Sequence, residues 1–353
     1  MINMKKFFTN TALIIGVFSA ALLPVTGISQ TGAAGTHYRN MPVVAPIGVN
    51  IGRHIPVIES AKGPAIDPAK GYRIQEMGEG LYMVTDNAVQ SMFLVYEKGV
   101  VLADVPEVLV QYIPKAIAEV TDQPVTHVIY SHSHADHIGG TGNLKLAKKP
   151  IIIAHEETKQ LLKRANDPAR PLPTVTFKDK YKLKVGSQTL ELSYHGNAHE
   201  PGNIFIYAPA QKTLMVIDII FPGWMPWRRL ALAQDVPGYF NQVEEISKMP
   251  WEKIITGHVE RSGTHDDVAV QLEFLTDLRN TAREALKTTK YGVGVDPADT
   301  DNPWAMFDNY IDRVVIQCVN ALTPKWANRL AGFDVYIWDQ CYTMEQSLRL
   351  DEH

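Results

Sequence analysis

The sequence predicts a mixed α/β fold with layered sheets, followed by a C-terminal helical extension. Three observations predict it. Short strand-like runs form hairpins early in the chain, strands and helices then alternate, and after residue 264 the apolar spacing becomes helical. The 353 residues are 45% hydrophobic and 20% charged, which is typical of a globular protein. Sheets of mixed direction are therefore expected, rather than a purely parallel sheet.

The first 29 residues are typical of a secretory signal peptide. Two lysines precede an apolar run over residues 11–23, and the small residues Gly27 and Ser29 stand before a cleavage point at Gln30. The run is short for a membrane-spanning helix, so no stable membrane insertion is expected, although an uncleaved anchor is the alternative. A periplasmic or secreted protein is predicted.

The remaining chain divides into three parts. Residues 30–68 are rich in Pro, Gly and Ala and are expected to form an N-terminal arm, residues 69–264 a main domain, and residues 265–353 the helical extension. In the main domain we expect strands at 80–84, 91–96, 100–104, 125–131, 150–154, 181–185, 188–194, 203–207, 213–217 and 253–256, and helices at 107–121, 140–148, 156–165 and 237–248.

Only two cysteines are present, Cys318 and Cys341, both in the helical extension. In an oxidising compartment they can form one disulfide, and otherwise they remain two buried thiols. The sequence does not distinguish the two states.

A cluster of ligand-type side chains begins where the apolar strand 128–130 ends. Its members are His132, His134, Asp136 and His137. Imidazole and carboxylate are usual zinc ligands. Alternate residues of an extended segment point the same way, so the first two histidines can bind one ion while the next two residues reach a second. Four solvated loop residues are the alternative, but the spacing indicates a metal site.

Three further ligand-type residues follow apolar strands. They are His199, Asp218 and His258. Each alone is weak evidence, because a single histidine at a strand end is more often packed or solvated. Strand ends of α/β layers open onto the crevices where sites form, so four such clusters together predict one shared centre.

In this spacing the sequence resembles the metallo-β-lactamase superfamily, whose motif is His-x-His-x-Asp-His followed by a His, an Asp and a final His. The resemblance covers about residues 72–262 and implies an αββα metallo-β-lactamase sandwich, to which the helical extension is added. It also implies that Asp104 supports the ligand loop, although an ordinary strand-end turn residue would look the same.

The resemblance further implies two Zn²⁺ ions per chain, although iron or manganese would also suit nitrogen and oxygen ligands. The first ion would be held by His132, His134 and His199. The second would be held by Asp136, His137 and His258, with Asp218 bridging the two.

Hydrolysis by a metal-activated water is the function implied, with Asp136 as the catalytic residue that orients the water. A cyclic amide or ester is the expected small-molecule substrate, and β-lactam hydrolysis is favoured. Asp218 stands where true β-lactamases usually carry Cys or Ser, so a lactonase or another ester or thioester hydrolase is the alternative. An iron oxidoreductase and a non-catalytic metal protein are less favoured, because all seven ligand positions are filled.

Substrate and partner contacts are also predicted. Trp224 and Trp227 are expected to form an aromatic wall, unless they fill the core beneath the extension. Arg228 or Arg229 is expected to hold a carboxylate. Tyr194 is a further candidate, with an ordinary strand-end role as its alternative. The net charge of −4 and the absence of a basic patch predict no nucleic-acid partner. A homodimer through the C-terminal helices is a possibility that the sequence leaves open.

Overall fold

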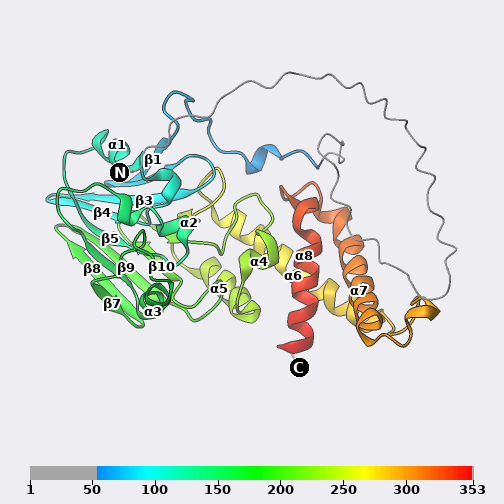
Figure 1. The fold of residues 1–353 in the computed structure, drawn as a ribbon. Coiled ribbons are helices and arrows are strands. Elements are labelled where there is room, and N and C mark those ends of the chain that lie inside the picture. The colour runs from blue at the N-terminus through cyan, green and yellow to red at the C-terminus, as the bar shows by residue number, and fades with distance from the viewer. Residues whose placement is uncertain (1–53, 352–353) are drawn as a thin grey trace, which may run out of the picture. The chain divides into compact units, whose positions relative to one another are not determined.

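A computed structural model describes residues 54–351, so the predicted signal peptide and most of the predicted arm lie outside the described residues. Two β-sheets form the centre of the fold (Figure 1). In the first sheet β1–β4 are antiparallel and β4–β7 are parallel. Its strands, in spatial order, are β1 (Arg73–Gly78), β2 (Leu81–Thr85), β3 (Gln90–Tyr96), β4 (Gly99–Ala103), β5 (Val125–Ile129), β6 (Ile151–His155) and β7 (Val175–Phe177).

The second sheet is antiparallel except for one parallel pair, β11 with β12. Its spatial order is β12 (Lys253–Ile255), β11 (Thr213–Val216), β10 (Ile204–Ala208), β9 (Gln188–Tyr194) and β8 (Lys180–Val185). The eight α-helices of the described chain are α1 (Ile113–Ala118), α2 (Ala135–Ile138), α3 (Glu156–Ala165), α4 (Arg228–Leu232), α5 (Val236–Lys248), α6 (His265–Thr288), α7 (Pro303–Trp326) and α8 (Phe333–Leu350).

Side chains that alternate between the two faces of each strand produce the layers. In β4, Val101 and Ala103 join the apolar cluster between the two sheets, whereas Val100 and Leu102 join a second cluster with α1, α2 and α3. Successive strand residues point to opposite faces, so a strand that is apolar throughout packs on both sides. The predicted αββα sandwich with C-terminal helices is confirmed.

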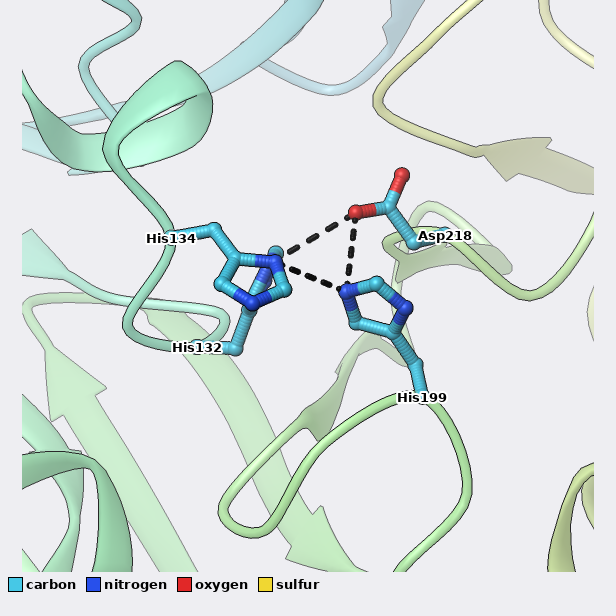
Figure 2. Close-up of side chains that lie close together, drawn as sticks. All are labelled: His132, His134, His199 and Asp218. Carbon is cyan, nitrogen blue, oxygen red and sulfur yellow. Dashed lines mark hydrogen bonds and ion pairs between the residues drawn. The ribbon is translucent and has the colours of Figure 1, made fainter. Parts of the chain in front are cut away.

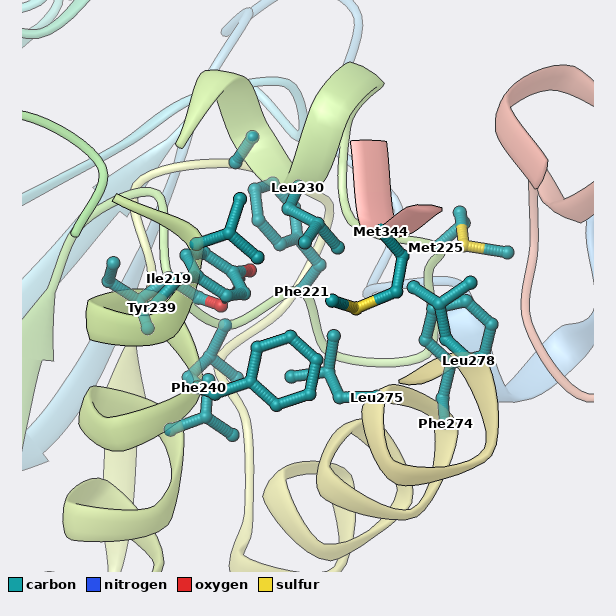
Figure 3. Close-up of a cluster of buried hydrophobic side chains, with 14 of the residues drawn as sticks. Ile219, Phe221, Met225, Leu230, Tyr239, Phe240, Phe274, Leu275, Leu278 and Met344 are labelled. Carbon is teal, nitrogen blue, oxygen red and sulfur yellow. Dashed lines mark hydrogen bonds between the residues drawn. The ribbon is translucent and has the colours of Figure 1, made fainter. Parts of the chain in front are cut away.

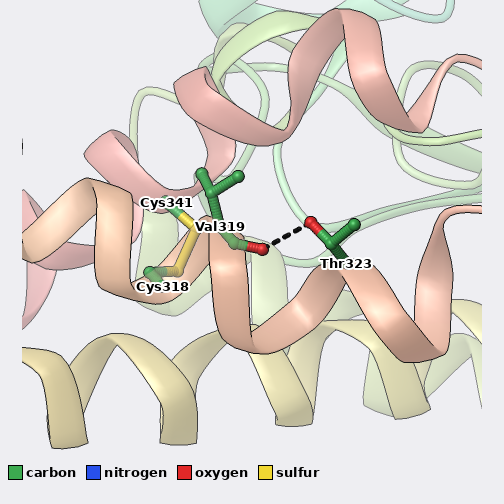
Figure 4. Close-up of a disulfide and its surroundings, with 4 residues drawn as sticks. All are labelled: Cys318, Val319, Thr323 and Cys341. Atoms are coloured by element: carbon green, nitrogen blue, oxygen red, sulfur yellow. Dashed lines mark hydrogen bonds between the residues drawn. A yellow bond between two sulfur atoms is a disulfide. The ribbon is translucent and has the colours of Figure 1, made fainter.

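The C-terminal helices cover the outer face of the second sheet. A third apolar cluster joins residues of β10 and β11 to α5, α6, α7 and α8, and Figure 3 shows part of it. Fully buried members such as Phe274 and Met344 each contribute about 1.5–3 kcal/mol through burial. Cys318 of α7 and Cys341 of α8 form a disulfide, which resolves the open question (Figure 4).

Two expected helices are wrong in extent. The helix expected at 107–121 is a 3-10 turn (Glu107–Leu109) followed by α1, which begins where Pro114 can occupy the first helical turn. The helix expected at 140–148 is only a 3-10 turn (Thr141–Asn143), because Gly142 packs directly on the backbone of residues 168–169.

Two short strands, β1 and β7, were not expected. β1 carries few β-branched residues and β7 has three residues, so neither shows a clear strand period. Among the described residues, no helix combines the length and apolarity that a bilayer crossing requires.

Candidate metal centre

Loops at the ends of four strands bring the seven predicted ligands together. The loop after β5 carries His132 and His134 and leads into α2, which carries Asp136 and His137. The other three ligands follow β9, β11 and β12, whose loops meet at the same edge of the sandwich; they are His199, Asp218 and His258.

The first group of ligands comprises His132, His134, His199 and Asp218, and one ligand atom from each lies within 4.8 Å of all the others (Figure 2). Asp218 Oδ2 is 3.5 Å from Nε2 of His132 and 3.3 Å from Nε2 of His199. His134 Nδ1 is 2.9 Å from Nε2 of His199.

The second group comprises Asp136, His137 and His258, again with ligand atoms within 4.8 Å of one another. Asp218 also contacts this group, because its Oδ2 is 3.1 Å from Nε2 of His137 and its Oδ1 is 3.2 Å from Nε2 of His258. One carboxylate therefore touches both groups, as a bridging ligand must.

Outer contacts orient the buried histidines of the first group. Nδ1 of His132 is hydrogen-bonded to the Ser131 hydroxyl at 2.9 Å. Nδ1 of His199 donates to the carbonyl of Ala231 at 2.5 Å. Because a carbonyl only accepts, Nδ1 of His199 carries the proton and Nε2 keeps its lone pair for an ion.

Glu200 orients His134 and was not singled out from the sequence. Its Oε2 is 3.2 Å from Nε2 of His134, and its Oε1 accepts from the backbone N–H of Ser133 at 2.6 Å. The carboxylate can only accept, so His134 is protonated at Nε2 and presents Nδ1 to the centre. The only signal in the sequence is that Glu200 directly follows a ligand, His199.

Asp104 supports the ligand loop from beneath. It is fully buried, and its Oδ1 accepts from the backbone N–H of Ser131 at 2.8 Å. Burial raises the pKa of this carboxyl to about 6. The contact fixes the point at which β5 ends and the ligand loop begins.

The ligand atoms fit a metal ion. Nε2 of His132 and Nε2 of His137 are buried and face the Asp218 carboxylate at 3.5 and 3.1 Å, but neither makes a hydrogen bond among the described residues. The facing nitrogens of His134 and His199 would both be lone pairs, which repel unless a cation lies between them. A set of imidazole nitrogens and carboxylate oxygens suits zinc.

Carboxylates and imidazoles in the cluster shift the pKa values of one another. Burial alone would raise the pKa of Asp218, but His137 and His199 outweigh it and hold that pKa well below its ordinary value. Burial would lower the pKa of His258, yet Asp136 and Asp218 outweigh it and raise it to about 10. Asp136 and Asp218 thus supply negative charge beside the histidine nitrogens, which favours a cation at this position.

The segment that orients His199 is α4, which is not a regular right-handed helix. Four consecutive residues, Arg229, Leu230, Ala231 and Leu232, have φ between 52° and 56°. This left-handed conformation costs an L-residue roughly 1–2 kcal/mol. Such a turn persists only where its surroundings hold it, and it places the Ala231 carbonyl against His199.

The centre opens into a cavity of about 810 Å³. Trp224 and Trp227 line it as expected from their positions, and Trp224 also packs against the core. Its other apolar lining side chains are Ala88, Ala135, Phe221, Met225, Ala231, Leu232, Val259 and Tyr336.

Two predicted substrate contacts do not line this cavity. Arg228 instead forms an ion pair with Asp339 of α8 at 2.8 Å. Tyr194 packs against His155, with ring centroids 4.0 Å apart and ring planes tilted by 31°. Tyr194 thus has a partner away from the cavity, whereas Arg228 also lies over the ring of the lining residue Tyr336, 6.0 Å from its centroid.

Comparison with known proteins gives consistent matches. The Metallo-beta-lactamase superfamily model matches residues 85–258. The alpha subunit of 2,4-dinitroanisole O-demethylase from Nocardioides sp. (strain JS1661) is 24% identical over 54% of this chain and 62% of its own length. The type 2 metallo-β-lactamase of Bacillus cereus is 32% identical over 33% of this chain and 45% of its own length.

This chain thus spans about half the length of the curated relatives it matches. Among solved structures, the metallo-β-lactamase from Pontibacter korlensis aligns with a TM-score of 0.51 and 19% identity, over 58% of this chain and 99% of that one. At this identity the alignment shows the fold alone.

Proposed function

Because the chain belongs to the metallo-β-lactamase superfamily through residues 85–258, we propose that it is an exported dinuclear zinc hydrolase that opens a lactone or another uncharged ester. The observation that supports hydrolysis most directly is the convergence of seven ligand-type side chains, with Asp218 touching both groups. When bound there, zinc ions supply an acidified water nucleophile and polarise the attacked carbonyl.

The chain's own residues prepare the reaction. Asp136 is 57% exposed and lines the cavity, so its carboxylate can orient the attacking water and accept its proton. The aromatic wall of Trp224 and Trp227 binds the apolar part of the substrate and excludes bulk water from it. Water adds to the carbonyl carbon, the ester C–O bond breaks, and the proton taken up by Asp136 passes to the leaving alkoxide oxygen. A lactone then gives one hydroxy acid, and an acyclic ester gives an acid and an alcohol.

The cavity lining favours an uncharged substrate. Of the described residues that line it, none is Lys or Arg, and the acidic side chains Asp136, Asp218 and Glu260 are all present. A substrate carboxylate would find no lysine or arginine in the lining itself, and Arg228, which lies over the lining residue Tyr336, is already paired with Asp339. Burying an unpaired charge is costly. The O-demethylase relative is named for 2,4-dinitroanisole, an uncharged aromatic ether, which agrees with such a pocket.

β-Lactam hydrolysis is the second candidate, because curated relatives that match this chain include metallo-β-lactamases. Common β-lactams carry a carboxylate, which Arg228 was expected to hold. Since Arg228 pairs with Asp339, that expectation loses its support, and the uncharged ester becomes the better candidate.

Export is supported by the disulfide between Cys318 and Cys341, because disulfides persist mainly in oxidising compartments. The predicted signal sequence agrees with a periplasmic or secreted location. Fractionation of cells that express the full chain would test this part of the proposal, which requires the mature protein outside the cytoplasm.

The substrate proposal is tested with paired substrates. The zinc-loaded protein is assayed with a lactone, an aryl ester, the same two compounds bearing an added carboxylate, and a chromogenic β-lactam. His134→Ala serves as the control for contaminating hydrolases. We expect kcat/KM to be at least tenfold higher for the uncharged member of each pair. Preferential turnover of the β-lactam would favour the second candidate, and no turnover of any substrate would overturn hydrolysis of this class.

A further inference from the structure

A buried glutamine of the last helix, Gln340, holds the left-handed turn beside the metal centre. Gln340 lies on α8 and is fully buried. Its Oε1 accepts from the backbone N–H of Leu230 at 2.7 Å. Its Nε2 donates to the carbonyls of Pro226 at 2.6 Å and Trp227 at 3.1 Å. One side chain thus binds the backbone at the start of the turn and inside it.

The turn connects this glutamine to a predicted ligand. Ala231 directly follows Leu230, whose N–H is bound by Gln340. The carbonyl of Ala231 accepts the hydrogen bond from Nδ1 of His199. Leu232 and Trp227, on either side, line the cavity. Four successive L-residues with positive φ do not adopt this form without external support, and Gln340 supplies hydrogen bonds from outside the segment.

We propose that Gln340 is a positioning residue for the metal centre. By holding the left-handed turn, it keeps the Ala231 carbonyl aimed at His199, which fixes the ring and leaves Nε2 free for an ion. The C-terminal helix α8 is then a part of the centre's construction, although it lies beyond residues 85–258, where the superfamily match ends.

A second glutamine on a C-terminal helix makes the same kind of contact. Gln271 of α6 accepts from the backbone N–H of Phe221 at 2.9 Å and donates to the carbonyl of Ile219 at 2.6 Å. That segment directly follows Asp218. Both helices therefore hold the backbone beside a ligand through a buried amide, which is a more specific role than covering the sheet.

The test measures ion binding, so it rests on the proposed metal centre but not on the proposed substrate. Zn²⁺ affinity is measured by chelator competition on the full chain, and Co²⁺ binding by its visible absorption. For Gln340→Met we expect the ion at the first ligand group, which contains His199, to be held about 10- to 100-fold more weakly. The Co²⁺ spectrum should also change, as when an outer partner of a ligand is lost.

Gln211→Met is the matched control. Gln211 is also a buried glutamine that binds a turn, because its Nε2 donates to the carbonyl of Glu79 and to the side chain of Gln188. It lies in the turn before β11, at the opposite end of that strand from Asp218. We expect this variant to unfold at a lower temperature and yet to bind both ions as the unchanged protein does.

A rescue variant separates positioning from general destabilisation. Arg229 is exposed, and glycine adopts positive φ without strain, so Arg229→Gly should hold the turn with less help. Adding Arg229→Gly to Gln340→Met should restore at least part of the lost ion affinity. If Gln340→Met alone folds poorly, ion affinity is measured on the double variant instead.

Two results would overturn the inference alone: Gln340→Met binding Zn²⁺ as tightly as the unchanged protein, or Gln211→Met weakening the binding equally. An unchanged protein that binds neither Zn²⁺ nor Co²⁺ would instead overturn the metal centre itself, and this inference with it.

Discussion

The two halves of the metal centre are built differently. In the first group, His132 and His199 are almost completely buried, and each ring is fixed by a contact on its outer nitrogen. In the second group, Asp136 is 57% exposed, and Nδ1 of His137 has no hydrogen-bond partner among the described residues. The first half is therefore preorganised by outer contacts, whereas the second half has fewer of them, and residues of both halves line the cavity.

This difference indicates that the two groups have different roles in ion binding and in substrate contact. Ligands that are already oriented lose less freedom when an ion binds, so the first group is expected to hold its ion more tightly. The exposed side chain of Asp136 is placed where a substrate and a water molecule can reach it. Stepwise loading, first group before second, follows from the comparison.

The largest effect is expected from Asp218→Asn, because Asp218 is the one residue that belongs to both halves. Losing its charge removes the shared ligand, so both ions should bind weakly. Hydrolysis should fall roughly a thousandfold or more, since metal-assisted charge stabilisation contributes several kcal/mol. Metal analysis after gel filtration measures the ions retained, and kcat/KM measures the loss of hydrolysis. If Asp218→Asn retained two tightly bound ions, Asp218 would not be a bridging ligand.

The next pair of variants compares the halves directly. His258→Ala should lose the second ion and keep the first, whereas His134→Ala should lose the tighter ion. Both should be nearly inactive and keep the fold, as circular dichroism would show. The measurement is the number of ions retained per chain at increasing chelator concentration. If either variant releases both ions at once, the two groups are a single cooperative site and the comparison fails.

The sequence predicted that the seven ligand-type residues would converge because they follow the ends of apolar strands, and strand ends are visible in the pattern of residues. It missed Glu200, since adjacency to His199 says nothing about which way the side chain points. It misplaced Arg228, because the competing partner Asp339 lies on a distant helix.

Backbone conformation was the least predictable feature. Nothing in Arg229-Leu230-Ala231-Leu232 suggests a left-handed turn, since these residues favour the right-handed one. The turn is imposed by tertiary contacts, including those of Gln340. In the same way, the state of Cys318 and Cys341 depended on how α7 and α8 pack, which spacing alone did not determine.

A smaller effect on the first half is expected from Glu200→Gln. The amide no longer favours the His134 tautomer that presents Nδ1, so the first ion should bind about 10- to 100-fold more weakly. The matched control is Glu245→Gln, because Glu245 pairs at 2.7 Å with His195, which belongs to neither ligand group. Equal losses in the two variants would mean that the change of charge, and not the orientation of His134, weakens binding.

The smallest effect is expected at the start of α6, outside both halves. Asp267 accepts from the backbone N–H of Thr264 at 2.9 Å and from both terminal nitrogens of Arg261. Burial would raise the pKa of Asp267, but Arg261 and Thr264 outweigh it and lower that pKa. Asp267→Asn should therefore reduce the free energy of unfolding by about 1 kcal/mol at pH 7 and leave ion affinity unchanged.

The pH dependence of that loss follows from the direction of the shift. A folded-state pKa below the unfolded one, which is about 3.9, means that the carboxylate stabilises the fold fully above that pH. The difference between Asp267→Asn and the unchanged protein should be constant from pH 7 to about pH 5. It should narrow only as the pH falls through the lowered folded-state pKa. Urea unfolding at several pH values measures it, with Thr264→Ser as the control that keeps the cap. A variant that also loses the tighter ion would show that α6 is coupled to the ligands through its first turn as well as through Gln271.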